Sequence, residues 1–441
     1  MDLVNKNKSN LSIASEHLKK YAVTYLFIAM SVFFVIVSGL DMNYVVGQLF
    51  QRLNRNAFIV LALIIPIIAG MGINFAITIG AMAAQIGLLL TINWEVTGWQ
   101  GILLAMAITL PLAAFFGFLI GKLLNKMKGQ ETIGSMILGY FANGAYQLLF
   151  LFIFGNIIPL NENVTIVGGT GVQNTLNLTG EVGLYTAIDG IYRVSFTNSL
   201  YFILAVIIVY ATVMFLIGKF SQEKYIVISI FVALVFAAYQ VPVINNVFTG
   251  KLSGRRAISI PVVTWVIIAV LCAFNYFIMK TRLGQKFRAV GQNRVVANAA
   301  GINVDRTRII AIMISTVLAG WGQIMFMQSE GIGTFQTYAA HEQVGLYAGA
   351  AILVGGASID RATNAQALIG TFLFHSLFIT AQNAASNLFG DATVGEYFRA
   401  FLSYGVIAVA LVIYSWRSVK AGKVGGKLRE EGNKAAKAAK N

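Results

Sequence analysis

The stretch "IIAIMISTVLAGWGQIMFMQ", residues 309–328, contains twenty residues and no charged side chain. A helix of about 20 mostly apolar residues is long enough to cross the hydrocarbon core of a bilayer, which is about 30 Å thick. The whole chain of 441 residues shares this character, with 57% hydrophobic and only 11% charged residues. Soluble domains carry about 25% charged residues. The sequence therefore predicts an all-α, polytopic integral membrane protein.

Further apolar segments lie on both sides of this stretch, and together they number twelve. Two of them have only fourteen residues and are too short to span a bilayer alone. We therefore expect about 10–12 membrane segments, two of which are short or broken helices. The twelve segments are 22–40, 57–70, 74–92, 101–124, 132–154, 200–218, 225–243, 260–279, 309–328, 344–357, 366–383 and 397–416.

The charged residues between these segments predict the orientation. Residues 280–308 include seven Lys or Arg and one Asp, whereas 329–343 and 384–396 carry acidic residues only. Because cytoplasmic loops are enriched in Lys and Arg, both termini and 280–308 are expected inside the plasma or inner membrane. The predicted organisation is a cytoplasmic segment 1–21, one transmembrane domain 22–416 with an external cap loop 155–199 and a cytoplasmic segment 280–308, and a basic cytoplasmic tail 417–441.

Two basic stretches do not follow this rule. Arg52 and Arg55 fall outside the membrane in this scheme, and so does the loop 244–259, which contains three basic residues. The cap loop itself is rich in Gly, Thr, Asn and Val, which is typical of short strands and turns. At this length it is too small to be a catalytic domain and large enough to be a docking cap.

The composition also excludes several classes of function. The formal net charge is +15, but no basic patch with interleaved aromatic residues is present, so we expect no nucleic-acid binding. The single cysteine, Cys272, excludes an intrachain disulfide framework and a cysteine-based metal site. The charge is therefore interpreted as facing the cytosol and anionic headgroups.

Ionisable residues are rare within the apolar segments, which argues against an enzyme. His375 is the exception, and we interpret it as a buried, hydrogen-bonded, neutral histidine. Asp360 and Arg361 are interpreted as a pair at a helix end. His341 and Glu342 have no second histidine at metal-binding spacing, so no metal site is expected. The sequence contains no Walker A pattern, and no cofactor is predicted.

Two glycine-containing interruptions occur at corresponding places in the two halves of the chain. They are "AGMGIN" at 69–74 and "LVGGASIDRATN" at 353–364, within regions of faint internal similarity at 22–124 and 309–416. Broken helices in corresponding halves are a pointer to a translocation site, although ordinary loops between spans are the alternative.

Uncharged polar side chains within the spans predict the lining of such a pathway. Amide and aromatic groups suit a neutral polyhydroxy or heterocyclic solute, and no positive cluster argues for an anionic one. Hydrogen bonding between helices is the alternative explanation for these amides. The candidate pathway residues are Asn74, Gln85, Asn143, Gln147, Gln323, Gly355 and Gly356.

Three stretches carry a resemblance to a known family. Residues 281–326, "TRLGQKFRAVGQNRVVANAAGINVDRTRIIAIMISTVLAGWGQIMF", resemble the cytoplasmic loop and following helix of ABC-importer permeases of the ribose / branched-chain amino acid type. Residues 350–374, with "GGAS", and 70–88, with "GIN", are similar to later and earlier segments of that family. The resemblance is poor over 155–260, where this chain is longer.

The resemblance implies that the segment 280–308 couples the membrane domain to a partner ATPase. Residues 294–300 are expected to form a short helix with alanines on one face, which Gly301 ends. Arg288, Arg306 and Arg308 would flank this face and pair with acidic groups of the partner. The candidate coupling residues are Gly284, Arg288, Ala289, Gly291, Asn293, Ala299, Ala300, Gly301, Ile302 and Arg306.

The sequence is accordingly interpreted as the permease subunit of an ABC importer for a simple sugar or a nucleoside. The implied partners are ABC ATPase subunits, a second permease subunit, an extracytoplasmic solute-binding protein and the lipid bilayer. A branched-chain amino acid permease is the alternative within the class. A stand-alone secondary transporter or channel is the alternative outside it.

Overall fold

The computed structural model describes most of the chain between residue 22 and residue 412. The described residues are 22–127, 129–153, 157–161, 164–167, 173–251, 254–330, 332, 334–336, 341–358, 361–402, 404–406, 408–409 and 412. Asp360 and the two terminal segments predicted from the sequence therefore lie outside the described residues, as do parts of the cap loop.

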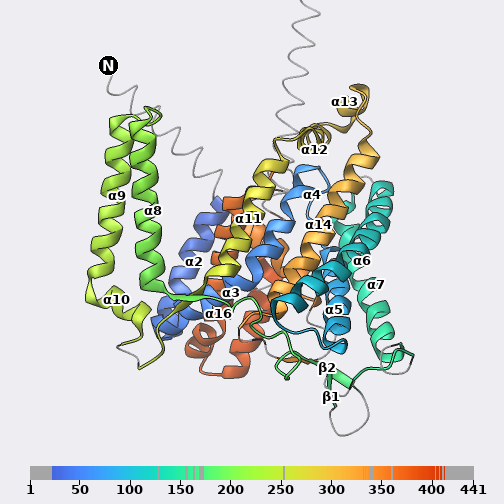
Figure 1. The fold of residues 1–441 in the computed structure, drawn as a ribbon, viewed down its shortest axis with the longest axis horizontal. Coiled ribbons are helices and arrows are strands. Elements are labelled where there is room, and N and C mark those ends of the chain that lie inside the picture. The colour runs from blue at the N-terminus through green and yellow to red at the C-terminus, as the bar shows by residue number, and fades with distance from the viewer. Residues whose placement is uncertain are drawn as a thin grey trace, which may run out of the picture.

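Helices make up nearly all of the structure (Figure 1). The first half contains α2 (Ala22–Ser38), α3 (Met42–Ala62), α4 (Ile64–Ile68), α5 (Ile77–Asn93), α6 (Gly98–Lys126), α7 (Glu131–Phe152), α8 (Phe196–Leu216) and α9 (Gln222–Gln240). The second half contains α10 (Pro242–Thr249), α11 (Val262–Ile278), α12 (Arg282–Gln292), α13 (Arg294–Ala299), α14 (Val304–Met327), α15 (Val344–Val354) and α16 (Asn364–Phe389). Residues 392–402 are also helical.

The membrane character expected from the sequence is confirmed. Within the described part of the chain, five helices are long and apolar enough to cross a bilayer, and a sixth results if α11 and α12 count as one bent span. The axes of α11 and α12 differ by 74°. Shorter apolar helices, α2, α5 and α15, lie among the long ones. The protein is therefore an all-α, multi-pass membrane protein.

The prediction of a short apolar segment at 57–70 is wrong. Helices α3 and α4 follow each other with only Leu63 between them, and together they form a membrane span of 27 residues from Met42 to Ile68. The first half of α3 contains polar residues, so the apolar run in the sequence is shorter than the helix. Arg52 and Arg55 were expected outside the membrane. They lie within helix α3, and therefore within this span. The other short segment is confirmed, since α15 has only eleven residues.

Helix α14 lies at the centre of the bundle and packs against α3, α5 and α6. Small residues allow the backbones to approach closely, as is common between membrane helices. A Cβ atom on Gly117 of α6 would lie 2.8 Å from the Cα of Met313 in α14. On the α5 side, a Cβ on Gly80 would overlap the carbonyl oxygen of Thr316. The stretch that predicts the membrane class is therefore also the core of the fold.

Short strands form two small sheets at one end of the bundle. Strands β1 (Thr165–Val167), β2 (Gln173–Asn177) and β5 (Thr334–Gln336) form one antiparallel sheet, and β3 (Arg193–Ser195) pairs with β4 (Ser259–Pro261) in the other. The turn-rich character expected for the cap loop is therefore present in its described part. Figure 1 shows β1 and β2 at the opposite end of the bundle from α12 and α13.

A buried carboxylate attaches the cap to the bundle. Asp189, which is 2% exposed, accepts hydrogen bonds from the side chains of Thr264 and Ser329 and from Gln328 Nε2 at 3.0 Å. Gln328 Oε1 in turn accepts from the backbone N–H groups of Ile188 and Asp189 at 3.0 and 3.1 Å. These bonds join the cap to α11 and to the end of α14.

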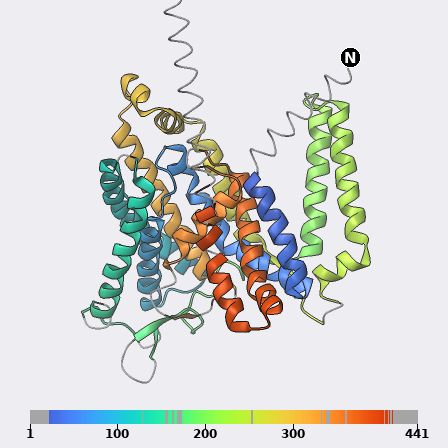
Figure 2. The same cartoon turned by 180° about the vertical axis from the view of Figure 1, so that it is seen from behind.

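Helices α8 and α9 form a hairpin beside the bundle rather than within it (Figures 1 and 2). They pack mainly against each other, and their principal contacts elsewhere are with α10, β3 and β4. Their surfaces are largely apolar and exposed. Apolar surface of this kind is compatible with lipid acyl chains. The region in which the family resemblance is poor thus includes this hairpin.

Candidate functional site

Two helices begin inside the bundle, and their N-terminal ends face each other. Helix α5 starts at Ile77 after the interruption at 69–76, and α15 starts at Val344. A Cβ on Gly345 would lie 2.6 Å from the carbonyl oxygen of Phe75, and one on Gly349 would lie 2.7 Å from the ring of Phe75. The predicted interruption at 69–74 is therefore a true break in the helical structure.

The length of α15 indicates how far the meeting point of the two helix starts lies from the α12 end of the bundle. Eleven residues of α-helix span about 17 Å, roughly half of the hydrocarbon thickness. The chain that follows α15 reaches the α12 end, because Arg361 and Ala362 line a cleft together with Ile68 and Gly291. The start of α15 therefore lies about halfway along the bundle. Irregular backbone at such depth occurs where it is buried in protein or lines a cavity.

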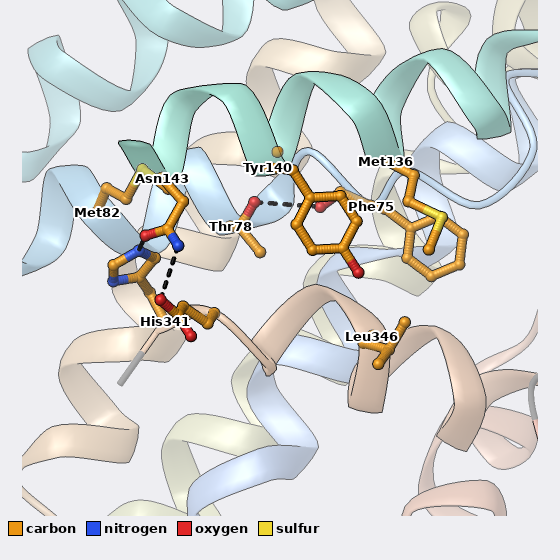
Figure 3. Close-up of a pocket in the computed structure, with 10 residues that line it drawn as sticks. Phe75, Thr78, Met82, Met136, Tyr140, Asn143, His341 and Leu346 are labelled. Atoms are coloured by element: carbon orange, nitrogen blue, oxygen red, sulfur yellow. Dashed lines mark hydrogen bonds between the residues drawn. The ribbon is translucent and has the colours of Figure 1, made fainter. Parts of the chain in front are cut away.

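A cavity of about 160 Å³ lies where the two helix starts meet α7 (Figure 3). Helix N-termini present unpaired N–H groups and partial positive charge to such a space. Because most lining groups are uncharged, the cavity suits polar groups of a small solute. It is lined by Phe75, Thr78 and Met82 from the α5 region, Met136, Gly139, Tyr140 and Asn143 from α7, and His341, Glu342 and Leu346 from the α15 region.

A hydrogen-bonded network of side chains closes one side of the cavity. His341 Nδ1 lies 3.0 Å from Gln85 Oε1, and His341 Nε2 lies 2.7 Å from Asn143 Oδ1. Tyr146 donates its hydroxyl proton to the same Gln85 oxygen at 2.6 Å. The histidine thereby connects α5, α7 and the residues before α15, and Figure 3 shows its ring between these elements.

Glu342 extends this network to the surface of α7. Its Oε1 accepts from Asn143 Nδ2 at 2.7 Å and from Gln147 Nε2 at 3.2 Å. Three of the amides proposed from the sequence, Gln85, Asn143 and Gln147, are thus brought together. His341 and Glu342, which join these amides, were not predicted as pathway residues, because this pair was considered only for metal binding.

The other proposed pathway residues lie elsewhere. Asn74 is buried in the break, where its Oδ1 accepts from the Ala76 N–H at 3.1 Å. Gln323 is buried in α14, and its side-chain atoms have no hydrogen-bond partner among the described residues. Gly355 and Gly356 lie at the opposite end of α15 from the cavity, where Gly355 packs against the α16 backbone.

The predicted coupling segment forms two short helices at the end of the bundle opposite the sheets. Thr281 caps α12 by accepting from the Gly284 N–H, and Asn293 caps α13 by accepting from Val295 and Val296 N–H groups. Helix α13 ends at Ala299 and Gly301 follows with a φ of +77°. The expected short helix and its glycine stop are therefore confirmed.

Helix α12 lies directly on the broken helix. A Cβ on Gly70 would be 2.8 Å from the Cα of Gly291, and one on Gly291 would overlap the carbonyl oxygen of Ile68. The φ of Gly70 is +70°, a conformation that a side chain disfavours. Arg294 Nη2 donates to the Gly70 carbonyl at 2.9 Å. The coupling segment and the interruption before α5 are therefore in backbone contact.

A buried ion-pair cluster holds this junction together. Glu131, the first residue of α7, pairs with Arg294 at 2.8 Å and with Arg308 of α14. Arg308 is 1% exposed, and its Nε lies 2.6 Å from the sulfur of Met71 in the break. The expectation that Arg308 is available to a partner is wrong, because the nearby carboxylate and the break enclose it. Sequence alone gives no sign of this pair, since 177 residues separate its members.

The outward face of α13 is exposed and carries small or apolar side chains. Ala299, Ala300 and Gly301 are exposed, and nothing lies within 4 Å of a Cβ built on Gly301. Val295 and Val296 are 78% and 62% exposed. We call these five residues the α13 tip. Of the remaining coupling candidates, Arg288 and Arg306 are exposed, while Ala289 and Ile302 are half-buried.

A group of arginines that was not predicted from the sequence lies at the sheet end of the bundle. Arg52, Arg255 and Arg399 line one cavity there. His375 is buried as expected, but its Nδ1 has no hydrogen-bond partner among the described residues.

The broken helices, the cavity between their ends and the exposed tip joined to the break define a membrane transport permease. The chain belongs to the family described as "Branched-chain amino acid transport system / permease component", whose model matches residues 52–415. It shares 31% identity over 160 residues with an autoinducer 2 import system permease protein of Klebsiella pneumoniae, covering 36% of this chain and 45% of that protein.

Two further relatives are similar over the same extent. The ribose import permease protein of Escherichia coli is 28% identical over 158 residues, or 36% of this chain and 46% of the relative. A nucleoside ABC transporter permease protein of Lactococcus lactis is 26% identical over 168 residues, or 37% of this chain and 40% of the relative. The alignments span about half the length of these relatives. No solved structure matches the chain.

Proposed function

We propose that the protein is the permease subunit of an ABC importer for a simple sugar or a nucleoside. The observation that carries this proposal is the backbone contact between Gly291 of α12 and Gly70 of the break, which joins an exposed tip to the interrupted helix. The names of the ribose and nucleoside relatives support the substrate class. A branched-chain amino acid is the alternative suggested by the family description.

The mechanism follows from these contacts. A partner ATPase that binds the α13 tip displaces α12, and the contact at Gly291 transmits the displacement to the break. Since the break leads into α5, its movement changes the space between the starts of α5 and α15. The network around His341 then releases or encloses the solute, whose hydroxyl or amide groups replace the partners of Asn143 and Gln85.

The proposal includes partners that the fold can accommodate. ATPase subunits would bind at the α13 tip, and an extracytoplasmic solute-binding protein would bind at the sheet end. A second permease subunit, identical or related, would complete the pathway beside α7, whose outer face is exposed. The broad apolar surface supports a location of this assembly in the cell membrane.

The orientation can be tested by labelling single cysteines from either side. We expect a cysteine at Asn293 to react only from the cytoplasm and one at Gly390 only from outside, in a background where Cys272 is replaced by Ser. Both positions are exposed, and they lie at opposite ends of the bundle. Labelling of both from the same side of intact cells would contradict this topology.

The transport class is tested in liposomes that contain the purified chain with and without its ATPase. Uptake of ribose or a nucleoside is expected only with the ATPase, ATP and the solute-binding protein. Flux through the chain alone would instead support a stand-alone transporter or channel.

A further inference from the structure

The arginine-lined cavity at the sheet end is separate from the cavity at the helix starts. It has a volume of about 230 Å³ and lies between α3, α16 and the helical residues 392–402. The pathway cavity, by contrast, is formed by the α5, α7 and α15 regions. The lining residues with arginine or amide side chains are Arg52, Arg255, Arg399, Gln48, Gln382 and Asn383.

Two of these guanidinium groups already have carboxylate partners. Arg255 Nε lies 3.5 Å from Asp41 Oδ2, and Arg399 pairs with Glu396. Arg52 has no carboxylate within ion-pair distance among the described residues, and its buried Nε has no hydrogen-bond partner there. The cavity therefore contains a cation whose charge the described side chains leave uncompensated.

The position of Arg52 makes this charge costly. It lies ten residues into α3, about 15 Å from the start of the helix. Its guanidinium lies 4.6 Å from the centre of the Phe378 ring, which provides a cation–π contact but no counter-charge. Arg55, one turn further along α3, adds a second positive charge nearby. Ionisable groups within membrane-spanning helices are costly and rare, and they commonly mark functional sites.

The remaining lining groups supply further hydrogen-bond donors. Gln48 on the α3 side and Gln382 and Asn383 on the α16 side have side-chain NH₂ groups. Guanidinium groups and amide N–H donors match the several oxygens of an oxyanion. Guanidinium groups can bind phosphate in a bidentate manner. A carboxylate has only two oxygens, so a cavity with donors on several sides fits a phosphate group better.

The geometry points to a binding site for a phosphate-type oxyanion in this cavity, with Arg52 as its principal ligand and Arg255 and Arg399 at its sides. The phosphate is that of a phospholipid headgroup or a free anion, and the chemistry of recognition is the same for both. The inference does not depend on the proposed transport function.

The test uses the full chain purified in detergent and free of phosphate. In the first arm, the midpoint of thermal unfolding is measured against inorganic phosphate, with sodium chloride at the same ionic strength as reference. In the second arm, native mass spectrometry measures binding of phosphatidylglycerol, with diacylglycerol as a lipid that lacks phosphate. The variant is Arg52→Gln, and the matched control is Arg256→Gln, an exposed arginine next to Arg255 that does not line the cavity.

We expect phosphate or phosphatidylglycerol to bind the wild-type chain and the Arg256→Gln control equally. Binding by Arg52→Gln should be about tenfold to one hundredfold weaker, because a hydrogen-bonded charge is lost. Stabilisation by inorganic phosphate alone identifies a free-anion site, and binding of phosphatidylglycerol alone identifies a headgroup site. If Arg52→Gln fails to fold, Arg399→Gln is measured in its place. We expect this variant also to bind phosphate or phosphatidylglycerol more weakly than the wild-type chain.

Two results would overturn the inference. One is that neither phosphate nor phosphatidylglycerol binds the wild-type chain more tightly than the chloride and diacylglycerol references. The other is that binding is the same in the cavity variant and in the Arg256→Gln control.

Discussion

Replacing Glu131 with glutamine tests the junction between the coupling segment and the broken helix. The substitution keeps the shape of the side chain and one acceptor oxygen, but it removes the negative charge between Arg294 and Arg308. Arg308 is 1% exposed and Glu131 is 7% exposed. The variant therefore leaves a buried cation without its counter-charge.

The magnitude follows from this burial. Removing one partner of a buried ion pair costs about 3–5 kcal/mol. Because glutamine keeps a hydrogen bond to Arg308, we expect the lower end, about 3 kcal/mol. With an unfolding entropy of about 2.1 cal/mol/K per residue, this lowers the unfolding temperature of the chain by about 3 °C. We also expect ATP-dependent uptake to fall, since the break is no longer tied to α14.

The control is Glu330→Gln at the sheet end, where the ion pair with Arg193 is partly exposed. Such a pair contributes less than about 1 kcal/mol, so its unfolding temperature should change by less than about 1 °C. Adding Arg308→Gln to Glu131→Gln should restore part of the loss, because the unpaired cation is removed. If Glu131→Gln unfolds at the same temperature as Glu330→Gln and transports normally, the cluster does not hold the junction.

Two further substitutions test the cavity and the cap. His341→Ala removes one hydrogen-bond partner from Gln85 and one from Asn143, although Tyr146 and Glu342 still contact these amides. We therefore expect a loss of about 1–3 kcal/mol and greatly reduced uptake, measured by thermal unfolding and solute accumulation; unchanged uptake would remove the network from the pathway. Asp189→Ala leaves several buried donors unpaired and should lower the free energy of unfolding by about 3 kcal/mol and expose the cap to protease in vesicles. Protease resistance equal to that of the wild type would show that Asp189 does not hold the cap.

The features that the sequence predicts well depend on local patterns. The uncharged run at 309–328 indicates a membrane helix because its composition alone determines that outcome. The short helix before Gly301 is equally local, since Asn293 caps its start and the glycine adopts the left-handed conformation at its end. The interruption at 69–74 follows from two glycines, both of which have positive φ.

The features that the sequence does not reveal depend on contacts between distant segments. A hydropathy pattern predicts that Arg52 lies in a loop, because the pattern depends on composition alone. The cavity that contains the Arg52 side chain forms only in the fold. The hydropathy pattern likewise treats Arg308 as a surface charge, although Glu131 lies against it in the fold. Gln85 and Asn143 are recognisable as polar residues in apolar segments, but only the fold shows that His341 joins them.

The central claim is that the α13 tip receives the partner ATPase. Gly301→Trp and Gly218→Trp form a matched pair, since both glycines have positive φ, at +77° and +74°, and nothing lies within 4 Å of a Cβ on either. The most direct measurement is co-purification of the cognate ATPase together with ATP-dependent uptake, for both variants at equal membrane levels. We expect Gly301→Trp to lose ATPase binding and uptake, because disruption at the centre of an interface costs about 2 kcal/mol or more, and Gly218→Trp to retain both. Equal ATPase binding and uptake by the two variants would contradict the claim.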